Sequence, residues 1–249
     1  MGTAHVTAAR PRPAFYALRP GGWRDYVTLL HPPYTLWHLS YVAVGAALAP
    51  RMDWTLLGWT TLAFALAMGI GAHALDELRG RPLQTRISPP VLLALAVASI
   101  SGACAIGIAV ALSRTLWLLV FVGVGAFLVV AYNLELFGGS FHGGLWFPAA
   151  WGAFPVLTAY FASVRTLHGA AVAGAAYAFA SSSAQRKLST PVRLVRRRVV
   201  AVSGEARLDD GTALPLDADA LAAVPEAALK ALVAATVLVA AALLLLRAG

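Results

Sequence analysis

Seven long apolar segments separated by short polar loops dominate this chain, and they restrict it to a membrane fold. A helix needs about 20 consecutive, mainly apolar residues to cross the hydrocarbon core of a bilayer. Stretches without a charged side chain cover residues 27–50, 54–75, 90–112, 115–132, 144–163, 166–183 and 231–246. The pattern predicts an all-α fold, a polytopic transmembrane helical bundle of about seven spans, because helices satisfy their own backbone hydrogen bonds in lipid.

The distribution of basic residues predicts how the bundle is oriented. Of the 19 Lys and Arg, 15 lie before the first segment or in the loops after the second, fourth and sixth segments. By the positive-inside rule these regions face the cytoplasm. The integral membrane protein therefore has a cytoplasmic N-terminus, and an odd number of spans leaves the C-terminus on the opposite side. The net charge of +8 is explained by these loops, so the lipid bilayer is the expected partner and nucleic acid is not.

We divide the chain into four parts on this basis. Residues 1–30 form a cytoplasmic N-terminal segment, 31–185 a six-span core, 186–228 a basic cytoplasmic loop, and 229–249 the final transmembrane helix. The basic loop contains residues 199–202, 205–208 and an Asp-Asp-Gly turn at 209–211, which together predict a small β-hairpin insert.

Three acidic residues stand close to membrane depth. Asp76 and Glu77 lie at the cytoplasmic end of the second segment, and Glu135 lies just past the fourth. A charge at the bilayer centre costs about 2.5 to 3.5 kcal/mol on insertion scales, so such groups usually face a cavity or a partner. His73 precedes Asp76 and Glu77 by three and four residues, which predicts that the three side chains share one helical face.

Other polar residues are expected on the same side of the membrane. Tyr132, Asn133 and His142 lie near Glu135, and the cytoplasmic half of the first segment contributes His31, His38 and Tyr41. We predict that they line one cytoplasm-facing cavity, opposite the basic residues Arg186, Lys187 and Arg193. The simpler alternatives are isolated core or interfacial histidines, and a basic cluster attracted to anionic inner-leaflet lipid.

Several motifs resemble the UbiA-type prenyltransferase superfamily. Residues 75–88, LDELRGRPLQTRIS, resemble its first aspartate motif and the RPL segment that follows. Residues 31–50 resemble its first span, AYNLELF its tyrosine motif, and WGAFPVLTAYF its fifth span. In this resemblance, which covers roughly residues 20–185, Asp76 matches the central aspartate, Arg81 the arginine of RPL, and Tyr132 the motif tyrosine.

The resemblance implies a reaction. In that superfamily aspartates hold Mg²⁺ on a prenyl diphosphate, the diphosphate leaves, and the allylic cation alkylates an acceptor or cyclises. The chain departs from the pattern in one major respect, because no acid occurs between Leu136 and Gly204, where the second aspartate motif would lie. Ala72 and Gly80 also replace expected polar residues, and seven spans would be fewer than the family's usual nine.

Three functions remain open from the sequence. The first is a divergent UbiA-like prenyltransferase or cyclase acting on an isoprenoid diphosphate with Mg²⁺ assistance. Its expected site residues are Asp76, Glu77 and Tyr132 for catalysis, and Arg81, Asn133, Arg186, Lys187, Arg193 and His38 for substrate binding. Its expected metal ligands are Asp76, Glu77, Glu135, His73 and His142.

The second function is a non-catalytic protein that binds a lipid or pigment, or supports another membrane protein. The third is an enzyme in which Zn or Fe is bound by histidine and carboxylate side chains, because imidazole suits these metals better than Mg²⁺. Its ligands would come from His38, His73, Asp76, Glu77 and His142.

Overall fold

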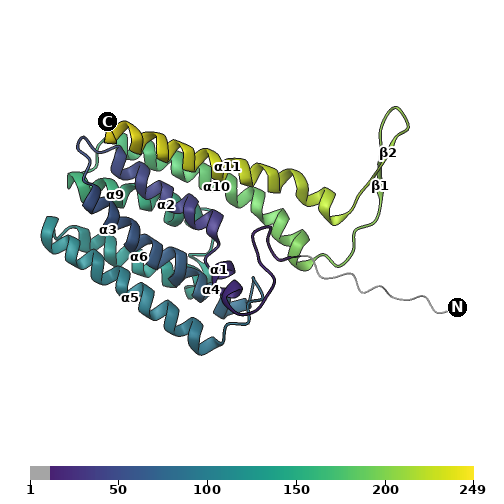
Figure 1. Cartoon of the computed structure of the whole chain (residues 1–249), viewed down its shortest axis with the longest axis horizontal. Coiled ribbons are helices and arrows are strands. Elements are labelled where there is room, and N and C mark those ends of the chain that lie inside the picture. The colour runs from purple at the N-terminus through teal and green to yellow at the C-terminus, as the bar shows by residue number, and fades with distance from the viewer. Residues whose placement is uncertain (1–11) are drawn as a thin grey trace.

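A computed structural model describes residues 12–249, which form a predominantly helical bundle (Figure 1). The first half contains α1 (Trp23–Leu29), α2 (Pro32–Ala47), α3 (Trp54–Phe64), η1 (Ala65–Ala72), α4 (His73–Gly80), α5 (Pro89–Arg114) and α6 (Leu118–Asn133). The second half contains α7 (Leu136–Gly139), α8 (Trp146–Pro148), η2 (Ala149–Ala153), α9 (Phe154–Val164), α10 (Gly169–Arg198), β1 (Glu205–Arg207), β2 (Ala213–Pro215) and α11 (Ala218–Ala248). The N-terminal part expected at 1–30 falls partly outside the described residues.

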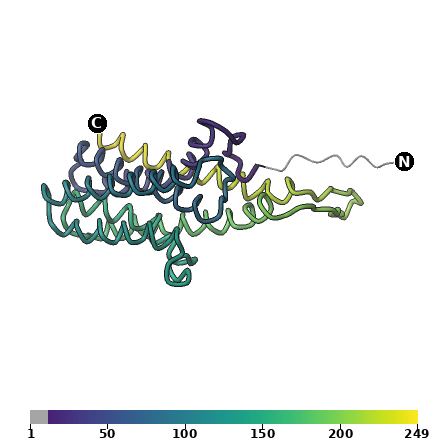
Figure 2. Tube along the Cα trace, turned by 90° about the horizontal axis from the view of Figure 1, so that it is seen from below, coloured from purple at the N-terminus to yellow at the C-terminus, as the bar shows by residue number. Residues whose placement is uncertain are grey.

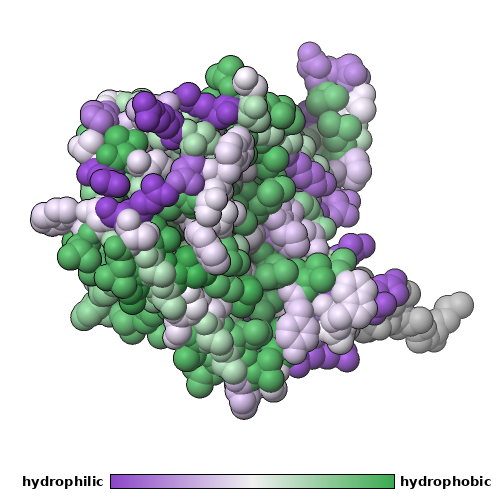
Figure 3. All heavy atoms as spheres, turned by 60° about the vertical axis from the view of Figure 1, so that its left-hand side comes forward, coloured by the Kyte–Doolittle hydropathy of each residue, from purple (hydrophilic) through white to green (hydrophobic). Residues whose placement is uncertain are grey.

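Four helices within residues 12–249 are long and apolar enough to cross a membrane. They are Trp54–Gly80, Pro89–Arg114, Trp146–Val164 and Ala218–Ala248. The apolar helix α6 has 16 residues, α2 also has 16, and α10 has 30 residues but ends in a basic stretch. Apolar side chains cover much of one face (Figure 3), as expected where lipid replaces water. The prediction of a helical membrane protein is thus supported, with four of the seven expected spans meeting both criteria.

Two of the long helices contain a π-helical segment. The helix α3 continues through η1 into α4, and α8 continues through η2 into α9. A π-helical turn widens the helix and is often found at a functional site. Both segments lie in the part of the bundle where the polar cavity described below is found.

Small residues allow the helices to approach closely, as the glycine content of the spans predicts. A Cβ added at Gly45 of α2 would overlap the carbonyl oxygen of Val156 in α9 and lie 2.9 Å from its Cα. A Cβ at Gly152 of η2 would lie 2.5 Å from the carbonyl oxygen of Ala178 in α10. These contacts hold α2, η2, α9 and α10 together around the site.

The basic segment differs from its predicted form. Helix α10 continues past Pro191 to Arg198, so the first part of the expected loop 186–228 is helical. The last helix starts at Ala218 rather than near 229, where the Asp217 side chain accepts a hydrogen bond of 2.7 Å from the Ala220 N–H. The C-terminal part of α10 and the N-terminal part of α11 form two helical arms. Arg196 joins them, because its Nε lies 2.9 Å from Oε1 of Glu226.

The hairpin insert is present between these arms (Figure 1). Strands β1 and β2 pair antiparallel around the predicted turn at residues 209–211, with Glu205 opposite Pro215. The prediction of a strand at 199–202 was wrong, because those residues follow the end of α10 and carry no strand. A separate protrusion, the segment between α6 and α8, leaves the side of the bundle (Figure 2).

Candidate binding chamber

A polar cavity of about 290 Å³ lies among α2, the η1–α4 helix, α6, η2 and α10. We call it the chamber. It is lined by eight of the side chains predicted for the site: His38, His73, Asp76, Tyr132, Asn133, His142, Arg186 and Arg193. Residues separated by more than 150 positions in the sequence therefore meet in one space, as the sequence predicted.

Glu77 does not line the chamber, although it is adjacent to Asp76. Its side chain is completely buried. It accepts hydrogen bonds from the Leu83 N–H at 3.0 Å, the Thr85 N–H at 2.8 Å and the Thr85 hydroxyl at 2.9 Å. Glu77 thus holds the loop after α4, and the expected shared face of His73, Asp76 and Glu77 reduces to His73 and Asp76.

Three other predicted residues also lie elsewhere. Arg81 donates hydrogen bonds to the carbonyl oxygens of Thr85 and Ile87 in the same loop. Glu135 pairs with Arg79 at 2.8 Å, and both side chains are partly exposed. Lys187 is exposed and points away from the chamber.

The chamber has an excess of positive charge. Arg186, Arg193 and Arg197 line it from α10, whereas Asp76 is the one carboxylate that residues 12–249 contribute to its lining. The Arg186 guanidinium is held in place, because it donates to the Tyr132 hydroxyl at 2.9 Å and lies 5.6 Å from the centre of the Phe147 ring. Burial lowers the pKa of Arg193 from its ordinary value, yet a guanidinium remains protonated in proteins.

Three chamber histidines have a defined tautomer. The Nδ1 atoms of His38, His73 and His142 lie 2.7, 3.1 and 3.0 Å from the backbone carbonyl oxygens of Trp151, Gly69 and Tyr132. A carbonyl oxygen only accepts, so each Nδ1 must carry a proton, and in the neutral imidazole each Nε2 is then an acceptor. The carbonyls that orient His38 and His73 belong to the π-helical segments η2 and η1.

The donor set limits what metal the chamber could hold. Within residues 12–249, no three His, Cys, Asp or Glu side chains lie close enough to hold a metal ion. The predicted ligands are divided, since Asp76, His73 and His142 line the chamber while Glu77 and Glu135 bond elsewhere. One carboxylate can still contribute to a Mg²⁺ site when phosphate oxygens of a guest supply other ligands.

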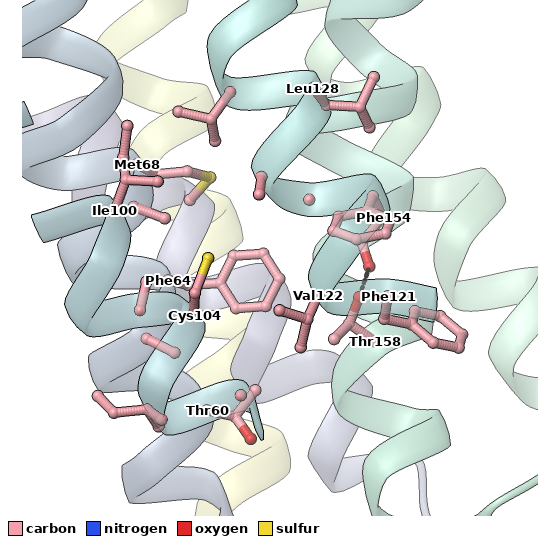
Figure 4. A pocket seen from close by; sticks show the side chains of 18 of the residues that line it. Thr60, Phe64, Met68, Ile100, Cys104, Phe121, Val122, Leu128, Phe154 and Thr158 are labelled. Atoms are coloured by element: carbon pink, nitrogen blue, oxygen red, sulfur yellow. Dashed lines mark hydrogen bonds between the residues drawn. The ribbon is translucent and has the colours of Figure 1, made fainter. Parts of the chain in front are cut away.

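An apolar pocket of about 110 Å³ adjoins the chamber. Phe64 and Met68 of the α3–η1 helix, Cys104 of α5 and Phe154 of α9 surround it (Figure 4). Met68 and Trp151 line both the pocket and the chamber. The polar chamber and the apolar pocket therefore share two lining side chains.

Of the other two residues expected from the first segment, His31 lines the chamber and Tyr41 does not. Sequence reasoning missed several polar residues of the chamber, among them Tyr16, Gln185 and Arg197. Arg197 could have been found from helical spacing, because residues 186, 193 and 197 share a face once the segment is recognised as a helix. Gln185 is 4% exposed, and its Oε1 has no hydrogen-bond partner within residues 12–249. The contribution of Tyr16 depends on how the N-terminal segment folds over the bundle, which no sequence pattern indicates.

Comparisons of the chain with protein-family models, with curated proteins and with solved structures give no match.

Proposed function

We propose that this protein binds an isoprenoid diphosphate in the chamber and transfers or cyclises its prenyl group, as a divergent UbiA-like membrane enzyme. The observation that supports the proposal is the junction of an arginine-rich polar chamber with an apolar pocket through Met68 and Trp151. This arrangement suits an amphiphile that has an anionic head and a hydrocarbon tail.

The head would be bound by arginines. A guanidinium pairs with two phosphate oxygens at once, and such charge-assisted hydrogen bonds are about twice as strong as neutral ones. Arg186 is already oriented by Tyr132 and Phe147, so little side-chain entropy would be lost on binding. Three arginines against one carboxylate match the charge of a diphosphate better than that of a cation.

The tail would lie in the apolar pocket. Its walls are almost entirely hydrocarbon, aromatic or sulfur atoms, and the Thr158 hydroxyl is engaged with the Phe154 carbonyl oxygen at 2.8 Å. Burial of a tail contributes about 0.8 kcal/mol for each CH₂ removed from water. A tail that extends from the chamber into the pocket would contact Met68 and Trp151, which line both spaces.

The reaction follows from this placement. The bond between the allylic carbon and the diphosphate oxygen breaks heterolytically, and the leaving oxygen takes the electron pair while Arg186 and Arg193 stabilise its charge. The ring centres of Phe147 and Trp151 lie 6.1 and 5.5 Å from the ring centre of Tyr132, and these aromatic rings would stabilise the allylic cation. An acceptor π-bond then forms the new C–C bond and loses a proton, for which a histidine Nε2 is the available base.

Asp76 together with phosphate oxygens of the guest would hold one Mg²⁺, and such an ion would neutralise further charge on the leaving group. We also propose that all seven apolar segments span the bilayer, with the chamber and the N-terminus on the cytoplasmic side and the C-terminus opposite. The distribution of Lys and Arg supports this orientation.

A second candidate function is binding without catalysis. The observation that favours it is the structural use of Glu77, which leaves Asp76 as the one carboxylate in the chamber lining. Such a protein would bind the same phosphorylated lipid but would release no diphosphate.

The test uses purified protein in nanodiscs with isoprenoid diphosphates of several chain lengths. Replacing Arg186 or Arg193 by Gln should weaken binding about tenfold to a hundredfold, because each change removes hydrogen bonds to a charged group. Lys187→Gln is the matched control, since Lys187 is a neighbouring exposed cation outside the chamber. Undiminished binding in both arginine variants would overturn the assignment, and tight binding without diphosphate release would select the second candidate.

A further inference from the structure

The N-terminal segment forms part of the chamber wall. We call residues 13–18 the strap. Its first four residues line the chamber, and Ala14 and Ala17 are only 9% and 1% exposed. The strap is therefore packed onto one end of the bundle, next to the C-terminal part of α10 and the N-terminal part of α11 (Figure 1).

Side chains from several helices hold the strap in place. The Tyr16 hydroxyl lies 3.0 Å from Nδ1 of His31, at the start of α2. The Lys230 ammonium of α11 lies 5.2 Å from the centre of the Phe15 ring, a cation–π distance. These contacts would have to break for the strap to lift, because each joins it to a different part of the bundle.

Arg197 occupies a special position between the strap and the chamber. Its Nε donates a hydrogen bond of 3.2 Å to the carbonyl oxygen of Pro13. The same side chain lines the chamber, and its two terminal nitrogens have no hydrogen-bond partner within residues 12–249. One planar guanidinium can thus hold the strap through Nε and bind an anion through its terminal N–H groups.

The positive charge near Arg197 should make its hydrogen bond to the strap depend on whether an anion occupies the chamber. Arg193 and Arg197 both line the chamber and lie four residues apart in α10, so their like charges repel each other. An anion between them would remove the repulsion and restrict the Arg197 side chain to one orientation. That orientation includes the hydrogen bond to the strap.

We propose that the strap is the cytoplasmic gate of the chamber, and that Arg197 couples its closure to occupancy by the anionic head. The latch between Arg197 and Pro13 stands on its own geometry, whereas the coupling to an anion rests on the proposed function. A closed gate excludes water from the chamber, which protects a reactive cation from hydrolysis. Opening of the gate gives the released anion a route to the cytoplasm.

Hydrogen–deuterium exchange of the strap tests this inference on the full chain in nanodiscs. The Leu18 N–H donates to the Thr28 hydroxyl oxygen and the Ala17 N–H to the Ala14 carbonyl oxygen, so their exchange reports opening. Without any anion, Arg197→Gln should speed this exchange about tenfold, the effect expected for one charge-assisted hydrogen bond. Arg198→Gln, an exposed neighbour outside the chamber, should leave it unchanged.

Inorganic pyrophosphate serves as the probe for the head. Saturating pyrophosphate should slow strap exchange severalfold in the wild type. In Arg197→Lys it should still bind but should no longer slow exchange, because a single ammonium lacks the fork that joins the two partners. This separation of binding from protection is a readout that loss of packing alone would not produce.

The outcomes separate the two proposals. Equal strap exchange in the wild type and Arg197→Gln without anion overturns the latch. Pyrophosphate that binds the wild type, as measured by calorimetry, without slowing strap exchange overturns the coupling. If pyrophosphate does not bind at all, the proposed function and the coupling both fail, and the comparison without anion still decides the latch.

Discussion

Asp76 and Glu77 are adjacent in the sequence but should respond to substitution in opposite ways. Asp76 lines the chamber, whereas Glu77 is fully buried and accepts three hydrogen bonds from the loop after α4. Replacing Glu77 by Gln should therefore destabilise the fold while leaving the chamber chemistry of each folded molecule intact. Asp76→Asn should do the reverse.

The magnitude follows from the three hydrogen bonds. In Glu77→Gln the amide oxygen can still accept from the Thr85 N–H and hydroxyl, but the amide NH₂ then faces the Leu83 N–H, where two donors meet. Leu83 is 3% exposed and Thr85 is 7% exposed, so water cannot replace the lost acceptor. Leaving a buried donor unpaired costs about 1 to 3 kcal/mol, and Glu77→Ala should cost about 3 kcal/mol or more because all three donors lose their partner.

The assay measures unfolding in mixed micelles and ligand binding per folded molecule. We expect a lower free energy of unfolding and near-normal binding for Glu77→Gln, and the opposite for Asp76→Asn. Thr85→Val provides a matched check, since it removes only the hydroxyl donor to Glu77. A Glu77→Gln protein with unchanged stability and abolished binding would refute the reasoning and return Glu77 to the functional site.

Three further predictions concern the scaffold. Gly45→Ala should destabilise the protein by about 1 to 3 kcal/mol through overlap with the backbone of α9, whereas Gly58→Ala, which meets nothing within 4 Å, should be neutral or stabilising in the same unfolding assay. A hydrogen bond from the first turn of α3 holds the pKa of Asp53 below its ordinary value of 3.8. Asp53→Ala should therefore lower the free energy of unfolding by about 1 kcal/mol at neutral pH. This difference should disappear as the pH falls below 3.8 and through the lower pKa of the folded state, where the native carboxylate becomes protonated. Arg196→Ala should lower stability by about 2 kcal/mol, because it leaves the Glu226 carboxylate, 8% exposed, without its partner; equal unfolding profiles for variant and wild type would show that the two arms are joined by other contacts.

The sequence could predict that polar residues of different segments meet in one chamber, because this depends on which end of each apolar segment carries them. His38, Asp76, Tyr132 and Arg186 all stand at ends that the basic loops assign to one side of the membrane. Antiparallel helices of similar length bring such ends together whatever their rotation. The structure accordingly places all four in the lining of the chamber.

The rotation of each helix could not be predicted. Successive residues of a helix are about 100° apart around its axis, so neighbouring acids can face different surroundings. In spans that are apolar all around, no hydrophobic stripe indicates which face is buried. The assignment of Glu77 and Asp76 to one cavity therefore failed on rotation, although both residues lie in the same short helix α4.

The sequence by itself determined the class of fold, the positions of the apolar segments, the hairpin turn and the end of the bundle at which polar groups collect. These depend on composition and on charge, which are local properties of the chain. Only the tertiary structure decided that Asp76 rather than Glu77 faces the chamber, and that the carbonyl of Pro13 meets Arg197. Contacts between residues so distant in the chain depend on the packing of every helix between them, which local patterns do not encode.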